Sequence, residues 1–212
     1  MGAVLQGHDL ECTRGDRVLF SGLDLRVEGG RGLYIAGENG SGKTSLLRIL
    51  CGLLAPTAGQ VTWNGTPTRE QREVFGNDLA YVGHVNGVKD DLTGAENLRF
   101  GAALAGRATD PAHILQALDS FGMASRALLP TRVLSQGQKR RVALARLLLA
   151  ADAPLWILDE PFTALDASGV AVLRGVVEAQ LARGGIVVLT THQDVGLPAS
   201  FARLDLTARL AA

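Results

Sequence analysis

Residues 33–44 read Leu33-Tyr-Ile-Ala36-Gly37-Glu-Asn-Gly-Ser-Gly42-Lys43-Thr44. The apolar run at the start predicts a buried strand, and apolar residues return at helical spacing over 45–54. The glycine-rich run between them fits the pattern G-x-x-x-x-G-K-[ST], which forms a phosphate-binding loop when a strand precedes it and a helix follows it. These residues therefore predict an α/β domain with a phosphate site at the end of a strand.

The loop has the chemistry that a nucleoside triphosphate requires. Glycines let successive backbone N–H groups turn toward one anion, and the positive end of the following helix faces the same phosphates. Lys43 is expected to reach the β- and γ-phosphates, and Thr44 to offer its hydroxyl to Mg²⁺. The alternative is a glycine-rich turn that binds nothing. The expected nucleotide-binding residues of the loop are Gly37, Glu38, Asn39, Gly40, Ser41, Gly42, Lys43, Thr44 and Ser45.

Two carboxylates follow a second apolar run, Leu155–Leu158. An Asp at the end of such a strand is the expected second support for the Mg²⁺ held by Thr44, which assigns that role to Asp159. Glu160 is expected to polarise the attacking water. The alternative for Glu160 is a plain carboxylate at the start of a helix.

The remaining pattern completes the domain around these motifs. Strands are expected over 4–12, 18–20, 23–27, 61–63, 79–82, 186–190 and 203–206, with 45–54 as the one helix before residue 85. From about residue 90 the periodicity is helical: Thr93 and Glu96 form a capping box, Asp110-Pro111 starts a second helix, and a third follows Gly137. We therefore expect a lobe of residues 1–85 and 151–212, with a helical subdomain at 86–150.

Composition excludes several classes of protein. The 212 residues carry 21 Lys and Arg against 21 Asp and Glu, and a balanced charge argues against broad nucleic-acid binding. The isolated Cys12 and Cys51 offer no redox or zinc pattern, and a reducing cytosol is expected. No apolar run is long enough to span a membrane, and the N-terminal residues have no signal-peptide pattern.

Leu134-Ser-Gln-Gly-Gln138 stands between the phosphate loop and the acidic pair. In this order the motifs resemble those of ABC-transporter nucleotide-binding subunits, over nearly the whole chain. The resemblance implies an ABC-type P-loop NTPase fold, with a mixed or parallel core sheet, an antiparallel β subdomain and an inserted helical subdomain. It also implies a homodimer in which the signature residues Leu134, Ser135, Gln136, Gly137 and Gln138 act in trans on ATP bound to the partner protomer. Asp166 matches the D-loop, and His192 matches the switch histidine, a second catalytic residue.

Two positions depart from the general pattern of that family. Where a glutamine usually follows the strand 79–82, this chain has His84, whose charge near pH 6.5 would add a pH sensitivity. Where an aromatic ring usually stacks on adenine, the chain has Arg14, with Phe20 as the nearby aromatic alternative.

Within the family, Gly83-His84 and the run 153–166 resemble the haem-exporter ATP-binding subunits of cytochrome c maturation. That resemblance implies a Mg²⁺-dependent ATPase of the translocase class, peripheral on the cytoplasmic face of the inner membrane. Its implied partners are an integral membrane permease, a haem-handling membrane protein and a chaperone. An ABC ATPase for another cargo and a soluble ATP-gated clamp remain open alternatives. The basic cluster of Lys139, Arg140, Arg141 and Arg146 is expected to be a solvated helix face.

Overall fold

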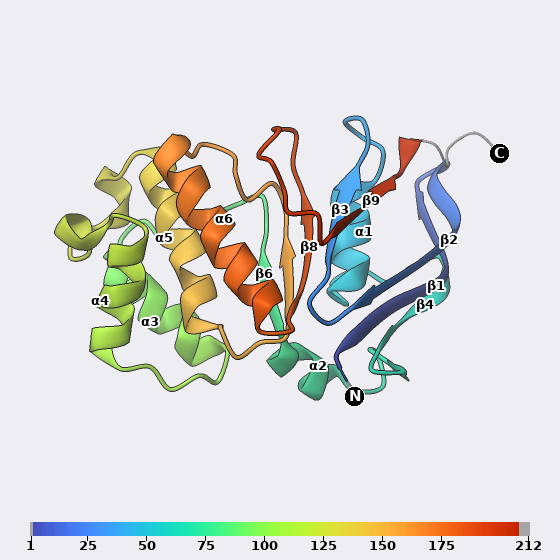
Figure 1. Cartoon of the computed structure of the whole chain (residues 1–212), viewed down its shortest axis with the longest axis horizontal. Coiled ribbons are helices and arrows are strands. Elements are labelled where there is room, and N and C mark those ends of the chain that lie inside the picture. Colours follow the sequence, from blue (N-terminus) through green and yellow to red (C-terminus); the bar gives the residue numbers. More distant parts are fainter. Residues whose placement is uncertain (1, 208–212) are drawn as a thin grey trace. The chain divides into compact units, whose positions relative to one another are not determined.

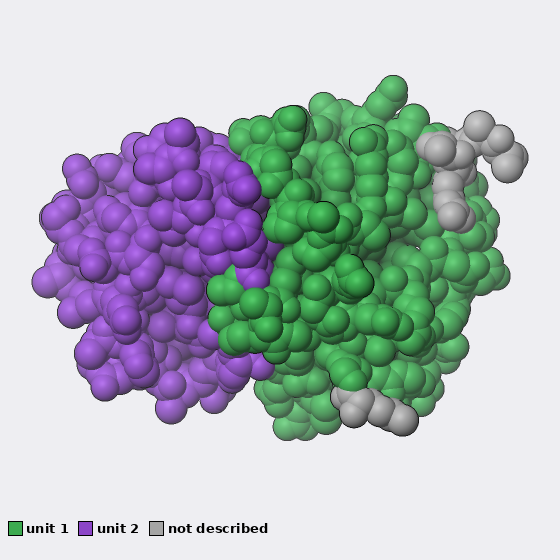
Figure 2. All heavy atoms as spheres, in the orientation of Figure 1, with its two compact units in different colours: residues 1–81, 153–160, 179–212 green, residues 82–152, 161–178 purple. Residues whose placement is uncertain are grey.

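A computed structural model describes residues 2–207, which divide into two compact units. Of the described residues, unit 1 comprises 2–81, 153–160 and 179–207, and unit 2 comprises 82–152 and 161–178 (Figure 2). Unit 2 thus takes in a segment beyond Glu160 as well as the helical stretch. Within residues 2–207, no helix combines the length and the apolar character needed to cross a membrane.

Unit 1 is built on two sheets (Figure 1). One has the strand order β2-β1-β4-β5 and is antiparallel; the other has the order β6-β7-β8-β3-β9, and β3 runs parallel to both of its neighbours. The strands are β1 (Val4–Arg14), β2 (Arg17–Glu28), β3 (Gly32–Ala36), β4 (Ala58–Trp63), β5 (Thr66–Pro67), β6 (Leu79–Val82), β7 (Leu155–Leu158), β8 (Ile186–Thr190) and β9 (Phe201–Asp205). The α/β class and the antiparallel β part agree with the sequence expectation.

The core of unit 1 lies where both sheets meet the helix α1 (Lys43–Leu50). Every residue of β7 and β8 is buried, as expected for strands of near-continuous apolar sequence in a parallel sheet. Leu46 and Leu47 of α1 are fully buried in the same cluster. The helix that follows the phosphate loop is therefore anchored in a buried apolar core.

Two expectations for unit 1 were wrong. The strands expected at 18–20 and 23–27 are one strand, because Gly22 takes a φ of 60° and the β1–β2 register shifts between Leu10 and Cys12 instead of breaking. The chain also forms a short helix that the apolar pattern did not indicate, α2 (Arg72–Asp78), whose one buried residue is Phe75.

Unit 2 holds the helices α3 (Gly94–Leu104), α4 (Pro111–Ser120) and α5 (Gln136–Leu149), which pack against one another (Figure 1). Two 3₁₀ turns, η1 (Ala124–Arg126) and η2 (Thr131–Val133), connect α4 to α5. The capping box of Thr93 and Glu96 is present at the start of α3. Helix α6 (Ala167–Ala182) begins in unit 2 and ends in unit 1.

Candidate functional site

The phosphate loop joins β3 to α1 within unit 1. Gly42 caps α1 with a φ of 101°, and a Cβ there would lie 3.2 Å from the Phe20 ring and from Leu19 Cβ. Only glycine suits that backbone conformation at such close approach. Lys43 is the first helical residue; its Nζ donates to the carbonyl oxygens of Gly37 at 2.6 Å and Glu38 at 2.9 Å. The ammonium is therefore held across the loop, at the N-terminus of a helix.

Ser41 tests whether the loop suits an anion. Its side chain is 2% exposed, and among residues 2–207 its Oγ has no hydrogen-bond partner. Buried hydroxyls in folded proteins are normally bonded. A Cβ on Gly37 would lie 2.5 Å from that Oγ, so the loop encloses it closely. A spare hydroxyl donor and the Lys43 ammonium, at the N-terminus of a helix, together fit a phosphate chain.

Thr44 and Asp159 meet at the other end of the loop. Thr44 Oγ1 donates to Asp159 Oδ2 at 3.0 Å, and Thr190 Oγ1 donates to Asp159 Oδ1 at 2.9 Å. Asp159 is 2% exposed, so its carboxylate depends on such partners. A hydroxyl and a carboxylate oxygen at one point are the hard oxygen donors that Mg²⁺ prefers.

Glu160 and His192 form a second pair beside this point. His192 Nε2 lies 3.1 Å from Glu160 Oε1, and the His192 backbone N–H donates to Glu160 Oε2 at 3.2 Å. Glu160 has a φ of 49°, and its own N–H donates to Thr190 Oγ1 at 2.9 Å. Helix α6 begins only at Ala167, so Glu160 is not a helix-start carboxylate. Strained backbone of this kind is concentrated at functional sites.

In unit 2, the signature residues lie at the start of α5. Ser135 is the N-cap: its Oγ accepts from the Gln138 N–H at 3.3 Å, and Gln138 Oε1 accepts from the Ser135 N–H at 3.0 Å. The first turn of α5 carries no acidic residue, so nothing there offsets its positive end. A Cβ on Gly137 would lie 2.7 Å from the Ala164 carbonyl oxygen, which makes glycine necessary.

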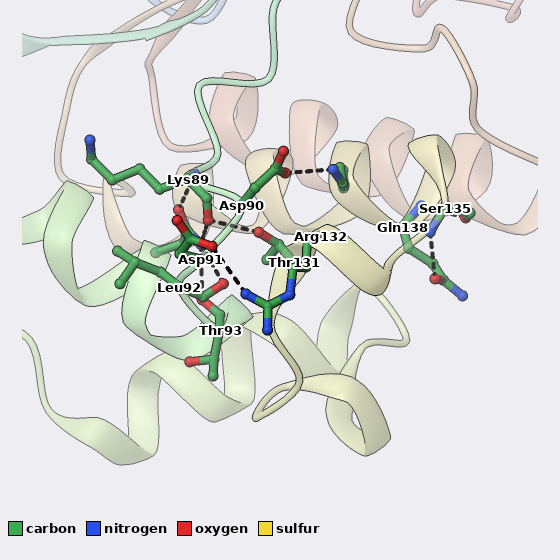
Figure 3. Close-up of polar contacts among 11 residues, drawn as sticks. Lys89, Asp90, Asp91, Leu92, Thr93, Thr131, Arg132, Ser135 and Gln138 are labelled. Carbon is green, nitrogen blue, oxygen red and sulfur yellow. Dashed lines mark hydrogen bonds and ion pairs between the residues drawn. The ribbon is translucent and has the colours of Figure 1, made fainter.

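The segment 89–93 contacts residues just before and just after the signature residues (Figure 3). Thr131 Oγ1 donates to the Lys89 carbonyl oxygen at 2.8 Å, and Arg132 pairs with Asp91 at 3.0 Å. Lys139, one residue beyond Gln138, pairs with Asp90 at 2.5 Å. These hydrogen bonds and ion pairs therefore join the segment 89–93, which follows the His84 loop, to the start of α5.

A pocket of about 460 Å³ opens at this end of unit 2. Ser135, Gly137, Gln138, Ala164 and Asp166 line it, together with Gly122, Met123, Arg126 and Arg141. Arg141 pairs with Asp166 at 2.5 Å. Hydrogen bonds from the Gly169 N–H and Ser168, and then Arg141, hold the pKa of Asp166 below its usual value. The pocket combines a helix N-terminus with cationic side chains, an arrangement suited to phosphate oxygens.

The family model described as ABC transporter matches residues 20–163. The chain belongs to the ABC transporter family. It is 50% identical to the cytochrome c biogenesis ATP-binding export protein CcmA of Nitrosospira multiformis over 205 residues, which are 96% of this chain and 99% of that protein. A putative ABC transporter ATP-binding protein from Pyrococcus furiosus matches with a TM-score of 0.84 and 26% identity, covering 97% and 98% of the two chains. A dimeric bacterial ABC transporter cassette, at 23% identity and a TM-score of 0.82 over 96% and 95%, shares the fold.

This ABC cassette is thus an ATP-binding ATPase, and the structure locates the predicted residues in two groups. In unit 1, hydrogen bonds through Thr190 join Thr44, Asp159, Glu160 and His192, and Lys43 directly precedes Thr44 in α1. In unit 2, the signature residues and Asp166 line one pocket. His84 lies exposed in the loop after β6, and Arg14 lies exposed at the end of β1; their predicted contacts with nucleotide stay predictions.

Two sequence expectations were wrong at these sites. Phe20 cannot stack on adenine, because it is fully buried beneath the phosphate loop. The basic cluster is not a solvated face: Arg140 is only 3% exposed, and the side chains of Lys139 and Arg141 are 15% and 16% exposed. Their acceptors come from segments distant in sequence, which a charge pattern along one helix cannot show.

Sequence reasoning also missed three residues of these sites. Thr190 bridges Asp159 and Glu160, although it reads as one more residue of an apolar strand. Arg126 lines the signature pocket from η1. Tyr81 lies close enough to Asp159 for electrostatic coupling: burial first, then Cys51 and Asp159, raise the pKa of Tyr81, and a hydrogen bond with Arg48 opposes that rise. None of the three belongs to a short motif, so the sequence carried no signal for them.

Proposed function

We propose that this chain is the ATP-hydrolysing subunit of a membrane ABC complex that serves cytochrome c biogenesis. In that complex, hydrolysis would drive haem export or release of a haem-loaded chaperone. Similarity over 96% of the chain to a protein named as a cytochrome c biogenesis ATP-binding export protein supports the role in cytochrome c biogenesis. The observation that carries the ATPase role is the contact of Thr44 with Asp159 beside the Glu160–His192 pair.

Each site residue of unit 1 then has a role in ATP hydrolysis. Lys43 and the loop N–H groups bind the β- and γ-phosphates, and Thr44 and Asp159 would hold Mg²⁺, which neutralises charge on the phosphates. Glu160 orients and polarises the attacking water in line with the γ-phosphorus. His192, within hydrogen-bond distance of Glu160, holds that carboxylate in place and faces the γ-phosphate. Gly37, Glu38, Asn39, Gly40, Ser41, Gly42 and Ser45 complete the loop, and Arg14 contacts the base.

The signature pocket of unit 2 acts on a second protomer. We propose a homodimer in which Ser135, Gly137 and Gln138, with Leu134 and Gln136 flanking them, face the γ-phosphate bound by the partner. The exposed positive end of α5 and its lack of acidic residues support this role. His84 would respond to the position of the attacking water, and Asp166 would respond to closure of the dimer. Closure of the dimer would generate the force that is transmitted to the membrane subunit.

The partners follow from the same proposal. The cassette would sit peripherally on the cytoplasmic face of the inner membrane, docked on an integral permease. A haem-handling membrane protein and a chaperone would complete the complex. The balanced charge, 21 basic against 21 acidic residues, gives no support to nucleic acid as a partner.

The test is an ATP-dependent pull-down of a tagged Glu160→Gln variant from native membranes. That variant keeps the loop intact but loses the carboxylate, so it should bind ATP, stop turning over and stay closed on its partners. Lys43→Ala is the matched control, because losing a charge-assisted phosphate contact should abolish ATP-dependent recovery. Partners are identified by mass spectrometry, and bound haem by absorbance.

Each outcome decides between named alternatives. Recovery of a multi-span subunit with a haem-handling membrane protein or chaperone supports the proposal. Recovery of an unrelated permease would keep the transport ATPase and discard the cytochrome c role. Ribosomes or DNA without a membrane protein would instead indicate a soluble ATP-gated clamp.

A further inference from the structure

Arg140 is the most deeply buried cation of the basic cluster on α5. It is 3% exposed and lies in the second turn of the helix that the signature residues begin. An ionised guanidinium at this depth is tolerated only when several acceptors surround it, because leaving water costs its charge a large solvation energy. The groups that accept hydrogen bonds from Arg140 therefore indicate which segments of the chain Arg140 joins.

Three of those acceptors come from two segments outside α5. Arg140 Nη1 donates to the Gly83 carbonyl oxygen at 3.0 Å and to Asn86 Oδ1 at 3.1 Å. Arg140 Nε donates to the Pro161 carbonyl oxygen at 3.3 Å. A guanidinium can serve both segments at once because its donors lie in a fixed planar fork.

These two segments flank residues of the proposed chemistry. Gly83 directly precedes His84, and Asn86 follows it by two residues. Pro161 directly follows Glu160. Arg146, further along α5, also contacts this loop. It donates to the Asn86 carbonyl oxygen and lies 3.6 Å from a Cβ placed on Gly87. Both sides of His84 are thus fastened to the signature helix.

We infer that Arg140 is a positioning residue for ATP hydrolysis, which fixes the His84 loop and the segment leaving Glu160 to the signature helix. This inference rests on the proposed function. Arg140 touches no substrate in this role: it sets the backbone on either side of groups that do. Its loss should therefore lower kcat and leave ATP binding by the phosphate loop in place.

The test measures kcat, KM and ATP affinity for Arg140→Lys in the full chain. Lysine keeps the charge but cannot fork between Gly83, Asn86 and Pro161, so kcat should fall roughly tenfold, the effect of one lost charged hydrogen bond. The Kd for ATP should stay within about twofold of the parent. Arg26→Lys is the matched control, because that arginine has a 53% exposed side chain in a surface pair with Glu28 on β2 and should leave kcat unchanged.

A double-mutant cycle separates positioning from general stability. If Arg140 acts through the His84 loop, Arg140→Lys should cost little further kcat in a His84→Ala background. Asn86→Ala removes one acceptor and leaves the guanidinium bonded to Gly83 and Pro161, so it should give a smaller fall in kcat even if Arg140→Lys folds poorly. Equal losses in both backgrounds would overturn the part of the inference that concerns the His84 loop. An unchanged kcat, or loss of ATP binding in step with Tm, would overturn the whole inference. A parent chain without ATPase activity would instead refute the proposed function itself.

Discussion

Glu160 occupies the left-handed region of backbone space, with a φ of 49°, although it carries a full side chain. Thr190 Oγ1 accepts its N–H, and the same hydroxyl donates to Asp159. Because Thr190 is fully buried, these two bonds lie in a low-dielectric interior, where hydrogen bonds are electrostatically stronger than in water. One hydroxyl therefore fixes the backbone of one carboxylate and the side chain of the other.

Replacing that hydroxyl should affect both stability and turnover. Thr190→Val keeps the shape but removes a hydrogen bond from each carboxylate residue, so unfolding free energy should fall by about 1–3 kcal/mol. Turnover should fall as well, because Glu160 loses the bond that holds its strained backbone. Denaturant unfolding and steady-state ATPase assays measure the two effects. Thr190→Ser should restore most of both; a valine variant with parental turnover would remove Thr190 from the site.

Gly137 provides a second test on single residues, through the close approach of its backbone to Ala164. Gly137→Ala should displace the Ala164 carbonyl and lower the free energy of unfolding by about 1–3 kcal/mol, the usual cost of overpacking. Gly175→Ala is the matched control: it lies inside α6, and its Cβ would meet nothing within 4 Å. There alanine should stabilise by about 0.5–1 kcal/mol. Thermal unfolding of both variants should give shifts of opposite sign.

At the scale of elements, the start of α6 depends on one carboxylate. Asp166 accepts from the Gly169 N–H at 2.8 Å and the Ser168 hydroxyl at 2.9 Å, and it pairs with Arg141. These contacts lower its pKa in the folded state. A group whose pKa is depressed on folding stabilises the protein above its unfolded pKa, and that stability is lost as the pH falls through the folded value.

The expected consequence is an acid-dependent difference between the parent and Asp166→Asn. Near neutral pH the parent should be more stable, and the gap should narrow below about pH 4, the ordinary range of an Asp pKa. Urea unfolding across that pH range measures the gap. Asp119→Asn, at an exposed helix position, is the control and should show no comparable gap. A gap that stays constant down to pH 2 would contradict the assigned contacts.

The elements nearest the motifs were the most predictable from sequence. A capping box acts over a few residues, so the start of α3 follows from Thr93 and Glu96 alone. Helix α5 begins at Gln136, two residues before the start expected after Gly137. Helix α2 was missed because it buries only Phe75 and so shows no apolar stripe. The burial of Arg140 was missed because its acceptors are carbonyl groups of distant loops, which no side-chain pattern encodes.

At the scale of the whole molecule, the two site groups lie in different units, and the proposed role of the signature pocket requires nucleotide bound to a second protomer. The proposed dimer makes activity depend on concentration. A group supplied in trans contributes roughly 10³ to 10⁵ in rate, so specific ATPase activity should fall as the chain is diluted below its dimer Kd. Rates measured over a dilution series, beside light scattering of Glu160→Gln with ATP, give the test. A specific activity that is constant at high dilution would exclude action in trans.

The division of the chain limits how this protein can be cut and rejoined. The polypeptide passes between its two units at 81/82, 152/153, 160/161 and 178/179, so neither unit is a contiguous fragment. Residues 153–160, which carry Asp159 and Glu160, are a short insert joined to unit 2 at both ends. No single truncation can therefore yield an isolated unit. A circular permutant opened in the turn at Gly15 and Asp16, between β1 and β2, would keep all four passages intact.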